Sequence, residues 1–145
     1  MSHEDIKSRL VRSRESVHKE LALIREARRL ERGFLRDRLR TYVLAKYLLT
    51  EENELVDDFD KLAELSLAKS SRISKELVAE FDTARSCDGA TSVMVKKVLL
   101  LRSIERELEI ELDAARTARI KSLNDLTDIV WDAMAASEKW STKLL

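Results

Sequence analysis

The sequence predicts an all-α protein, an elongated antiparallel three-helix bundle or coiled coil. Its 145 residues include two glycines and no proline, and 44% are hydrophobic while 37% are charged. This composition is typical of long helices. Apolar residues also recur at three- and four-residue steps along most of the chain, which aligns them on one face of a helix. We therefore expect a single domain over residues 1–145, with helices at about 4–48, 51–86 and 92–140.

The first predicted helix, over about residues 4–48, has a clear apolar face. At 100° per residue, its main apolar positions fall within one narrow arc of the helical wheel. These positions are Ile6, Leu10, Val17, Leu21, Ile24, Leu35, Leu39 and Tyr42. A second apolar line lies about a third of a turn away, and it consists of Leu23, Ala27, Leu30 and Phe34. We therefore expect the middle of this helix to contact two neighbours.

A second helix is predicted to begin at Thr50 and to end near residue 86. Thr50 is a favourable N-cap, and Glu51 and Glu52 would lie in the first turn, where the helix dipole favours acidic side chains. Apolar residues then continue at helical spacing as Leu55, Phe59, Leu62, Ile73, Leu77 and Phe81. Because neither glycine nor proline lies near Thr50, the alternative is a two-helix hairpin whose first helix is continuous through residue 86.

The stretch SCDGATS, residues 86–92, predicts the turn before the third helix. Gly89 can adopt the left-handed conformation that ends a helix, and Thr91 or Ser92 can cap the next one. A heptad-like alternation then extends to about residue 140. Its apolar positions are Met94, Val98, Leu101, Leu108, Leu112, Ala115, Leu126, Ile129, Ala133 and Trp140, interrupted by Glu105, Arg119 and Ser122.

The cysteine content and the apolar runs predict a soluble, cytoplasmic protein. Cys87 is the single cysteine, so the chain has no internal disulfide to favour an oxidising compartment. The first ten residues are polar and lack the apolar core of a signal peptide. No strictly apolar run exceeds four residues, as in Val98–Leu101, which is far too short to span a bilayer.

Few residues in this sequence have the spacing or the surroundings that catalysis or metal binding requires. Glu15 and His18 have the E-x-x-H spacing of metal-binding bundles, but His3, the other histidine, has no such partner. Cys87 precedes Asp88, whose charge would disfavour a thiolate. No glycine-rich phosphate loop or nucleophile motif is present. We therefore expect no enzymatic activity, no bound metal and no cofactor.

Charge is distributed unevenly along the chain, although it is zero overall. Residues 1–49 contain 13 basic and 7 acidic side chains, and residues 50–91 contain 5 basic and 11 acidic ones. In the basic segment, arginines recur at steps of three and four, which would align them as one ridge on a continuous helix. This arginine ridge consists of Arg25, Arg29, Arg32, Arg36 and Arg40.

The favoured explanation of the arginine ridge is pairing with the acidic second segment. The predicted partners are Asp57, Asp58, Asp60, Glu64, Glu76 and Glu80. The alternatives are an exposed ridge that binds anionic lipid headgroups or phosphates, or one that binds an acidic protein. The sequence does not favour nucleic acid as a partner, because the chain has no net basic charge and no aromatic side chains alternate with the arginines.

Trp131 is the other candidate interaction residue. It lies off the stripe that Leu126 and Val130 share with Trp140, so it is either an exposed interface anchor or a contact with a second neighbour inside the fold. Together, these patterns favour a non-enzymatic scaffold or adaptor. It would act through coiled-coil self-association and protein binding, as a homodimer or as a subunit of a larger assembly. The alternative function is a membrane-surface or phosphate-binding bundle that uses the arginine ridge.

Overall fold

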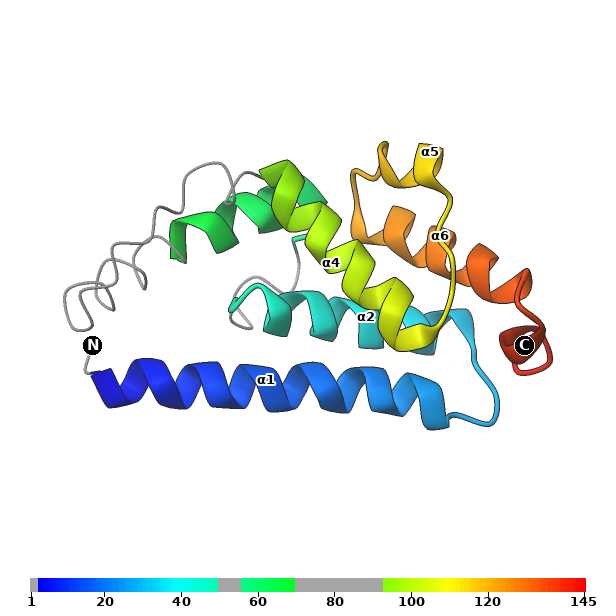
Figure 1. The fold of residues 1–145 in the computed structure, drawn as a ribbon, viewed down its shortest axis with the longest axis horizontal. Coiled ribbons are helices and arrows are strands. Elements are labelled where there is room, and N and C mark those ends of the chain that lie inside the picture. The colour runs from blue at the N-terminus through cyan, green and yellow to red at the C-terminus, as the bar shows by residue number, and fades with distance from the viewer. Residues whose placement is uncertain (1–2, 50–55, 70–92) are drawn as a thin grey trace.

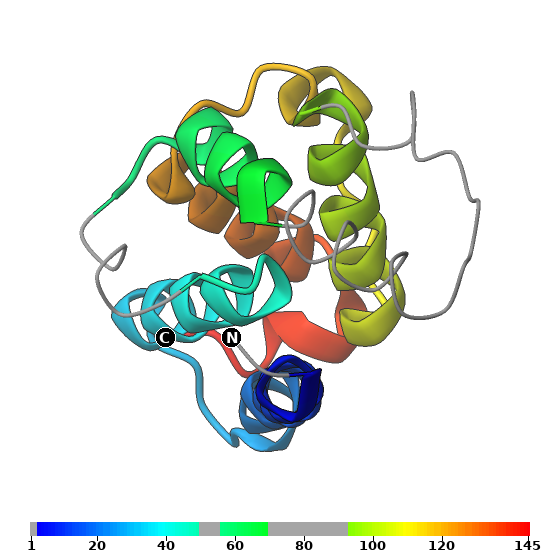
Figure 2. The same cartoon turned by 90° about the vertical axis from the view of Figure 1, so that its left-hand side faces the viewer.

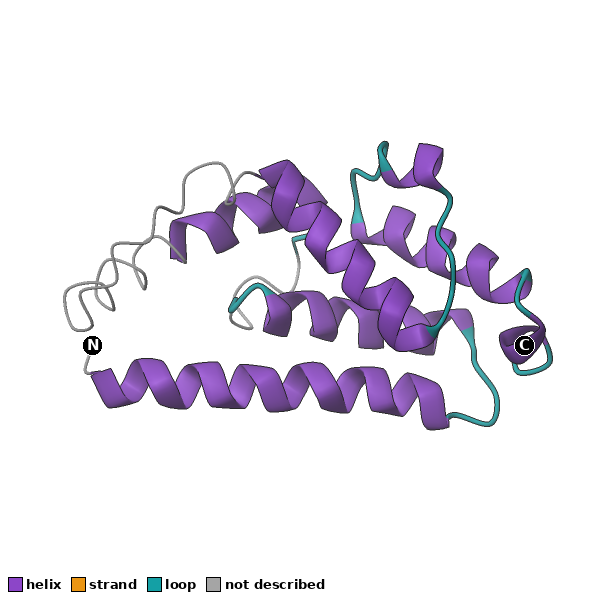
Figure 3. Ribbon diagram, in the orientation of Figure 1, coloured by secondary structure: helices purple, strands orange, loops and turns teal. Residues whose placement is uncertain are grey.

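A computed structural model describes residues 3–49, 56–69 and 93–145 of the chain. The described residues form helices and loops without a β-strand (Figure 3), which confirms the all-α prediction. The predicted cap at Thr50 and the predicted turn around Gly89 lie outside these ranges.

The described helices surround one hydrophobic core (Figures 1 and 2). The elements are α1 (His3–Glu26), α2 (Arg32–Lys46), a helix over 59–69, α4 (Val93–Leu108), α5 (Ala114–Thr117), α6 (Leu123–Ala135) and α7 (Glu138–Ser141). The largest fully buried side chains are Trp140, Tyr42 and Phe59, which come from three different parts of the chain. The predicted stripe residues Leu21, Ile24, Leu35, Leu39 and Tyr42 all lie in this core.

The prediction of one helix over residues 4–48 is wrong, because the chain turns back between α1 and α2. Leu30, at this turn, is fully buried, and its backbone pairs with the C-terminal segment. Its N–H donates to the Lys143 carbonyl at 2.8 Å, and its carbonyl accepts from the Leu145 N–H at 2.9 Å. These tertiary bonds replace the helical ones that Leu30 would otherwise make, and α2 packs alongside α1 (Figure 1).

Helix α2 ends at residue 46, so the alternative of one helix continuous through residue 86 is also wrong. Leu48 adopts a left-handed conformation, with φ of 59°. The Leu49 N–H then donates to the Leu44 carbonyl at 2.8 Å. This is the Schellman arrangement, which satisfies a free carbonyl at a helix end. Part of the second predicted helix, 51–86, is seen as the helix over 59–69.

The prediction of one helix over residues 92–140 is wrong as well. Helix α4 ends in a second Schellman turn, in which Glu109 has φ of 54° and the Ile110 N–H donates to the Glu105 carbonyl at 3.1 Å. Residues 110–113 are extended, and Asp113 caps the short α5. A capping box of Ser122 and Asp125 then starts α6. Ser122, one of the three residues that interrupt the heptad pattern, is therefore the N-cap of a new helix.

The starts of the 59–69 helix and of α6 are joined to each other by backbone pairing. The Phe59 N–H donates to the Lys121 carbonyl at 2.8 Å, and the Leu123 N–H donates to the Asp57 carbonyl at 2.9 Å. Each bond satisfies an N–H at the start of a helix that has no partner within that helix. The pairing fixes the 59–69 helix relative to the C-terminal part of the chain.

Candidate interaction surfaces

The arginine ridge does not exist as one continuous surface, because the turn between α1 and α2 divides it. Arg25 lies in the last turn of α1, Arg29 in the connection, and Arg32, Arg36 and Arg40 on α2. Carboxylates contact four of these guanidinium groups. The pairs are Arg25 with Glu107 at 3.2 Å, Arg32 with Asp128, Arg36 with Asp37 at 3.5 Å, and Arg40 with Asp57 at 3.0 Å. Arg29 is exposed.

Pairing with the acidic segment accounts for only part of this arrangement. Arg40 contacts Asp57, as expected, and it also donates to the Val56 carbonyl at 3.2 Å. Asp58 instead accepts from the Lys61 N–H, and Asp60 contacts Lys97. Of the other predicted partners, Glu64 is exposed, and Glu76 and Glu80 lie outside the described residues. The partners of Arg25 and Arg32 come from α4 and α6, which are much farther along the sequence.

Trp131 lies on α6 and is half-buried against the core. The Arg32 guanidinium carbon lies 6.0 Å from the centroid of its indole ring, a cation–π geometry. The same Arg32 contacts Asp128, one turn earlier on α6. Two residues singled out from the sequence, Arg32 and Trp131, thus meet between α2 and α6, and part of the indole surface is already used inside the fold.

Within the described residues, exposed large apolar side chains are grouped on α4, in a surface that we call the α4 face. It consists of Met94, Val98 and Leu99, with exposed fractions of 69%, 40% and 57%, followed by the exposed Arg102 and Arg106. A different side of this helix packs into the core, and its buried residues are Leu100, Leu101, Ile104 and Leu108. The expectation that Met94 and Val98 belong to the buried stripe is therefore wrong. The run VMVKKVLLL at residues 93–101 could have predicted this surface. It places apolar residues on more than one side of a helix, so burial of one side leaves others exposed.

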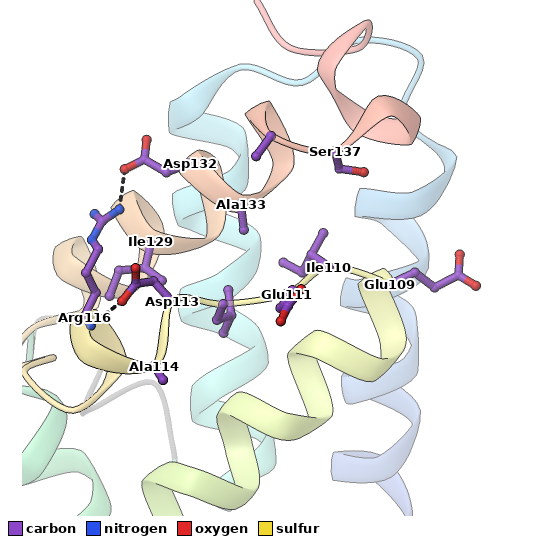
Figure 4. A pocket seen from close by; sticks show the side chains of 12 residues that line it. Glu109, Ile110, Glu111, Asp113, Ala114, Arg116, Ile129, Asp132, Ala133 and Ser137 are labelled. Carbon is purple, nitrogen blue, oxygen red and sulfur yellow. Dashed lines mark hydrogen bonds and ion pairs between the residues drawn. The ribbon is translucent and has the colours of Figure 1, made fainter.

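A groove of about 610 Å³ lies between the extended residues 110–113 and α6 (Figure 4). We call it the α5–α6 groove. Its apolar lining comes from Ile110, Leu112, Ile129, Ala133 and Ala136. Its charged lining comes from Glu109, Glu111, Asp113, Asp132 and Arg116. Sequence reasoning missed this groove, although Asp113 and Ser122 carry the N-cap chemistry that marks the two helix starts beside it.

Most of the charged groups that line the groove have partners within the protein. Arg116 contacts Asp132 at 2.6 Å, and its backbone N–H donates to Asp113 at 2.9 Å. Glu109 accepts a hydrogen bond from Lys139, which lowers the pKa of the Glu109 carboxyl. Glu111 is exposed and forms no ion pair with any residue in the described ranges. The groove thus combines an apolar floor with an excess of negative charge.

A buried polar cluster lies beneath α4. The Lys96 ammonium donates to the fully buried Ser66 hydroxyl at 2.8 Å and lies 5.5 Å from the Tyr47 ring centroid. Burial lowers the pKa of Lys96. A lysine beside a serine can serve as a general base, but Ser66 is covered on all sides, so a substrate cannot reach it in this structure. The cluster therefore gives no support for catalysis.

The hydroxyls of Tyr42 and Tyr47 are buried, and neither has a hydrogen-bond partner of acceptable geometry among the described residues. Burial is the main cause that raises the pKa of Tyr42 to about 12, although the neighbouring Ser103 opposes this increase. Burial also raises the pKa of Tyr47, and Tyr42 and Asp60 add to the effect. Both side chains are therefore held in the neutral form.

The two tyrosines predict a loss of stability at alkaline pH. Burial raises the pKa of Tyr42 in the folded protein, whereas tyrosine in the unfolded chain ionises near pH 10. The stabilisation that Tyr42 provides in its neutral form is therefore complete below about pH 10 and is lost as the pH rises toward 12. We expect the melting temperature to fall over this interval. Tyr47→Phe should reduce the fall, and at neutral pH it should raise the free energy of unfolding by about 1 kcal/mol, because it removes an unpaired buried hydroxyl. Thermal melts of both proteins at neutral and alkaline pH provide the measurement, and an equal fall in the variant would contradict the prediction.

The remaining sequence candidates show no assembled site. Glu15 and His18 are exposed on α1. Within the three described segments, no group of three or more His, Cys, Asp or Glu side chains has the arrangement of a metal site. Cys87 lies outside those segments. No helix in them has both the length and the apolar character needed to cross a bilayer.

The comparisons with known proteins give no relative from which to infer a function. No protein-family model matches the chain, and neither curated proteins nor solved structures match it significantly.

Proposed function

We propose that this chain is a non-enzymatic helical scaffold or adaptor that acts by self-association and by binding other proteins. The observation that carries the proposal is the α4 face, where Met94, Val98 and Leu99 expose apolar surface side by side on one helix. Grouped apolar residues of this kind mark binding surfaces on folded proteins. The single cysteine further supports a cytoplasmic location as part of the proposal.

The size of the α4 face indicates how the contact would be made. Completing the burial of the three apolar side chains would contribute about 1 kcal/mol each, since each is already partly covered. That gain is too small for a stable complex, which usually buries about 800 Å² on each partner. The contact must therefore extend along α4 to Arg102 and Arg106, where it would meet acidic groups on the partner. Because α4 has 16 residues, this would be a short helix–helix contact instead of a long coiled coil.

The membrane-surface or phosphate-binding alternative has less support. Its basis was a continuous basic ridge, but the turn between α1 and α2 separates Arg25 from the arginines of α2. Carboxylates also neutralise most of the group, for example Glu107 at Arg25 and Asp128 at Arg32. Arg29 is exposed in the connection, but a single arginine adds only about 1 kcal/mol of attraction to an anionic surface.

A pair of matched substitutions tests the proposal. Leu99 and Val11 are almost equally exposed, at 57% and 56%, but only Leu99 lies on the α4 face. We expect Leu99→Glu to weaken self-association, or the capture of a specific protein partner from native extract, by at least about tenfold. Val11→Glu should leave both unchanged. Light scattering over a range of concentrations gives the oligomeric mass, and circular dichroism should show that both variants fold.

Two outcomes would contradict the proposal. One is a monomeric wild-type protein that captures no partner. The other is an equal effect of Leu99→Glu and Val11→Glu, which would indicate a nonspecific loss. Binding to anionic vesicles that is lost with Arg29→Glu would instead support the membrane-surface alternative.

A further inference from the structure

We propose that the α5–α6 groove is the binding site for the α4 face of a second copy of this chain. This inference rests on the proposed function and assigns both sides of the self-association contact. It joins two different surfaces of the molecule, so each copy carries one of each.

The first argument is the match in chemical character between the two surfaces. The α4 face offers aliphatic side chains, with Met94 and Leu99 the most exposed. The groove has a volume of about 610 Å³. Its apolar lining includes Ile129 and Leu112, which expose only 4% and 7% of their surface, and the more exposed Ala133 and Ala136. A cavity of about 150 Å³ accommodates a benzene ring, so the groove has room for several aliphatic side chains. Figure 4 shows that the lining residues lie on α6 and on the chain segment that follows α4.

The second argument is charge complementarity. Arg102 and Arg106 lie on the C-terminal half of the α4 face, and the Arg106 side chain is 75% exposed although it contacts Glu107 at 3.7 Å. Arg102 forms no ion pair with any residue that the structure describes. Asp132 and Glu109 of the groove already contact Arg116 and Lys139. Glu111 and Asp113 form no ion pair among the described residues, but Asp113 accepts a hydrogen bond from the Arg116 N–H as the N-cap of α5, which leaves Glu111 as the groove carboxylate most available to a partner. The contact would therefore pair Arg102 of one copy with Glu111 of the next.

The third argument concerns the symmetry of the contact. A contact between two copies of the α4 face would bury apolar side chains but would leave Glu111 of the groove without a cation. A contact between the α4 face and the groove would bury apolar side chains and would also pair an exposed arginine with a carboxylate. Contacts between two different surfaces generate either closed assemblies or open chains, and the measured mass distinguishes these two forms.

Charge reversal tests the assignment with the full chain. Arg102→Glu and Glu111→Lys should each weaken self-association by about tenfold, because each places like charges together in the contact. The double variant Arg102→Glu/Glu111→Lys should recover most of the wild-type association, since it restores an opposite pair. Arg14→Glu and Glu26→Lys are the controls, since both residues are exposed on α1. Sedimentation and light scattering over a range of concentrations provide the measurement.

Mixing the two single variants gives an independent readout. The Arg102→Glu chain keeps a wild-type groove, and the Glu111→Lys chain keeps a wild-type α4 face. An equimolar mixture should therefore form a mixed assembly of the two variants that neither forms alone, since every contact between unlike variants joins opposite charges. A mixture that associates no better than its separate components would overturn the assignment.

The proposed function and this inference fail in different ways. If Leu99→Glu abolishes association while both charge reversals leave it unchanged, the groove assignment is wrong and the α4 face binds elsewhere. A monomeric wild-type protein that captures a different protein through the α4 face would also overturn the inference, but it would leave the scaffold proposal in place. A protein that neither self-associates nor binds a partner overturns both.

Discussion

Trp140→Ala is expected to lower the free energy of unfolding by about 4 kcal/mol, the largest effect of any single substitution considered for this protein. Trp140 is fully buried, and its indole N–H donates to the Leu108 carbonyl at 2.8 Å. That carbonyl lies at the C-terminal end of α4, where carbonyls have no hydrogen-bond donor within the helix. The substitution would remove a large apolar side chain and also leave this acceptor unpaired. Since small domains have total stabilities of about 5–15 kcal/mol, the loss would be a large fraction of the total.

The effect of Trp140→Ala should extend to the turn between α1 and α2. Lys143, whose ammonium lies 5.0 Å from the Trp140 ring centroid, also donates to the Arg25 carbonyl at 3.2 Å. Its own carbonyl accepts from the Leu30 N–H. Trp140 therefore supports the C-terminal segment that holds this turn in place. We expect faster hydrogen exchange at the Leu30 amide in the variant.

Urea unfolding followed by far-ultraviolet circular dichroism measures the stability of the Trp140 variant without using tryptophan fluorescence. Trp140→Phe should cost about 2 kcal/mol, since it keeps much of the apolar volume and loses the hydrogen bond. Trp131→Ala is the matched control and should cost about 1–2 kcal/mol, because Trp131 is only half-buried. Equal losses for Trp131→Ala and Trp140→Ala would contradict the structure.

The second large effect is expected from Arg38→Met, which would cost about 3 kcal/mol at neutral pH. Arg38 on α2 contacts Glu20 on α1 at 2.8 Å. The Glu20 side chain is only 6% exposed, whereas that of Arg38 is 29% exposed. Removing the arginine would leave a buried carboxylate without a cation. Removing the carboxylate is less costly, because Arg38 can extend toward solvent, so Glu20→Leu should cost about 1 kcal/mol.

A double-mutant cycle tests this asymmetry. The variant Glu20→Leu/Arg38→Met should be nearly as stable as the wild type, since replacing a buried ion pair by apolar side chains is often close to neutral. Arg25→Met is the control. It breaks an ion pair with Glu107 in which both side chains are more than a third exposed, so it should cost less than about 1 kcal/mol. Additive losses in the cycle would show that Glu20 and Arg38 do not interact.

The sequence was informative about the fold wherever the signal is local. The main stripe from Leu21 to Tyr42 predicted core residues correctly on both sides of a turn that the same pattern did not reveal, whereas Phe34 of the second apolar line is exposed. The three- and four-residue spacing of apolar side chains continues across this turn. The reason is that α1 and α2 are both helices with an apolar face, so the pattern of each one follows the other without a visible break. Ser122 is a different case, since its capping box with Asp125 is a local signal that predicts a helix start.

The interaction surfaces were less predictable, because each depends on segments that are distant in sequence. Helix α4 has apolar residues on more than one side, so its sequence allows either Met94 and Val98 or Leu100 and Ile104 to face the core. Packing against the other helices selected the second set. The carboxylate partners of Arg25 and Arg32 are likewise on α4 and α6, and their spatial proximity depends on the turns at Leu30, Glu109 and Ser122.

The sequence by itself determined that this protein is helical, that the main apolar stripe from Leu21 to Tyr42 faces the core, and that its charges balance. These properties follow from composition and from residue spacing within single helices, so neighbouring residues are sufficient to predict them. Tertiary structure alone decided where the first long apolar pattern turns back, which face of α4 is exposed, and which carboxylates pair with the arginines. Each of these depends on a hydrogen bond or a packing contact between distant residues, such as Leu30 with Lys143. Such a contact stabilises the protein only when both segments are folded together, so neither segment predicts it by itself.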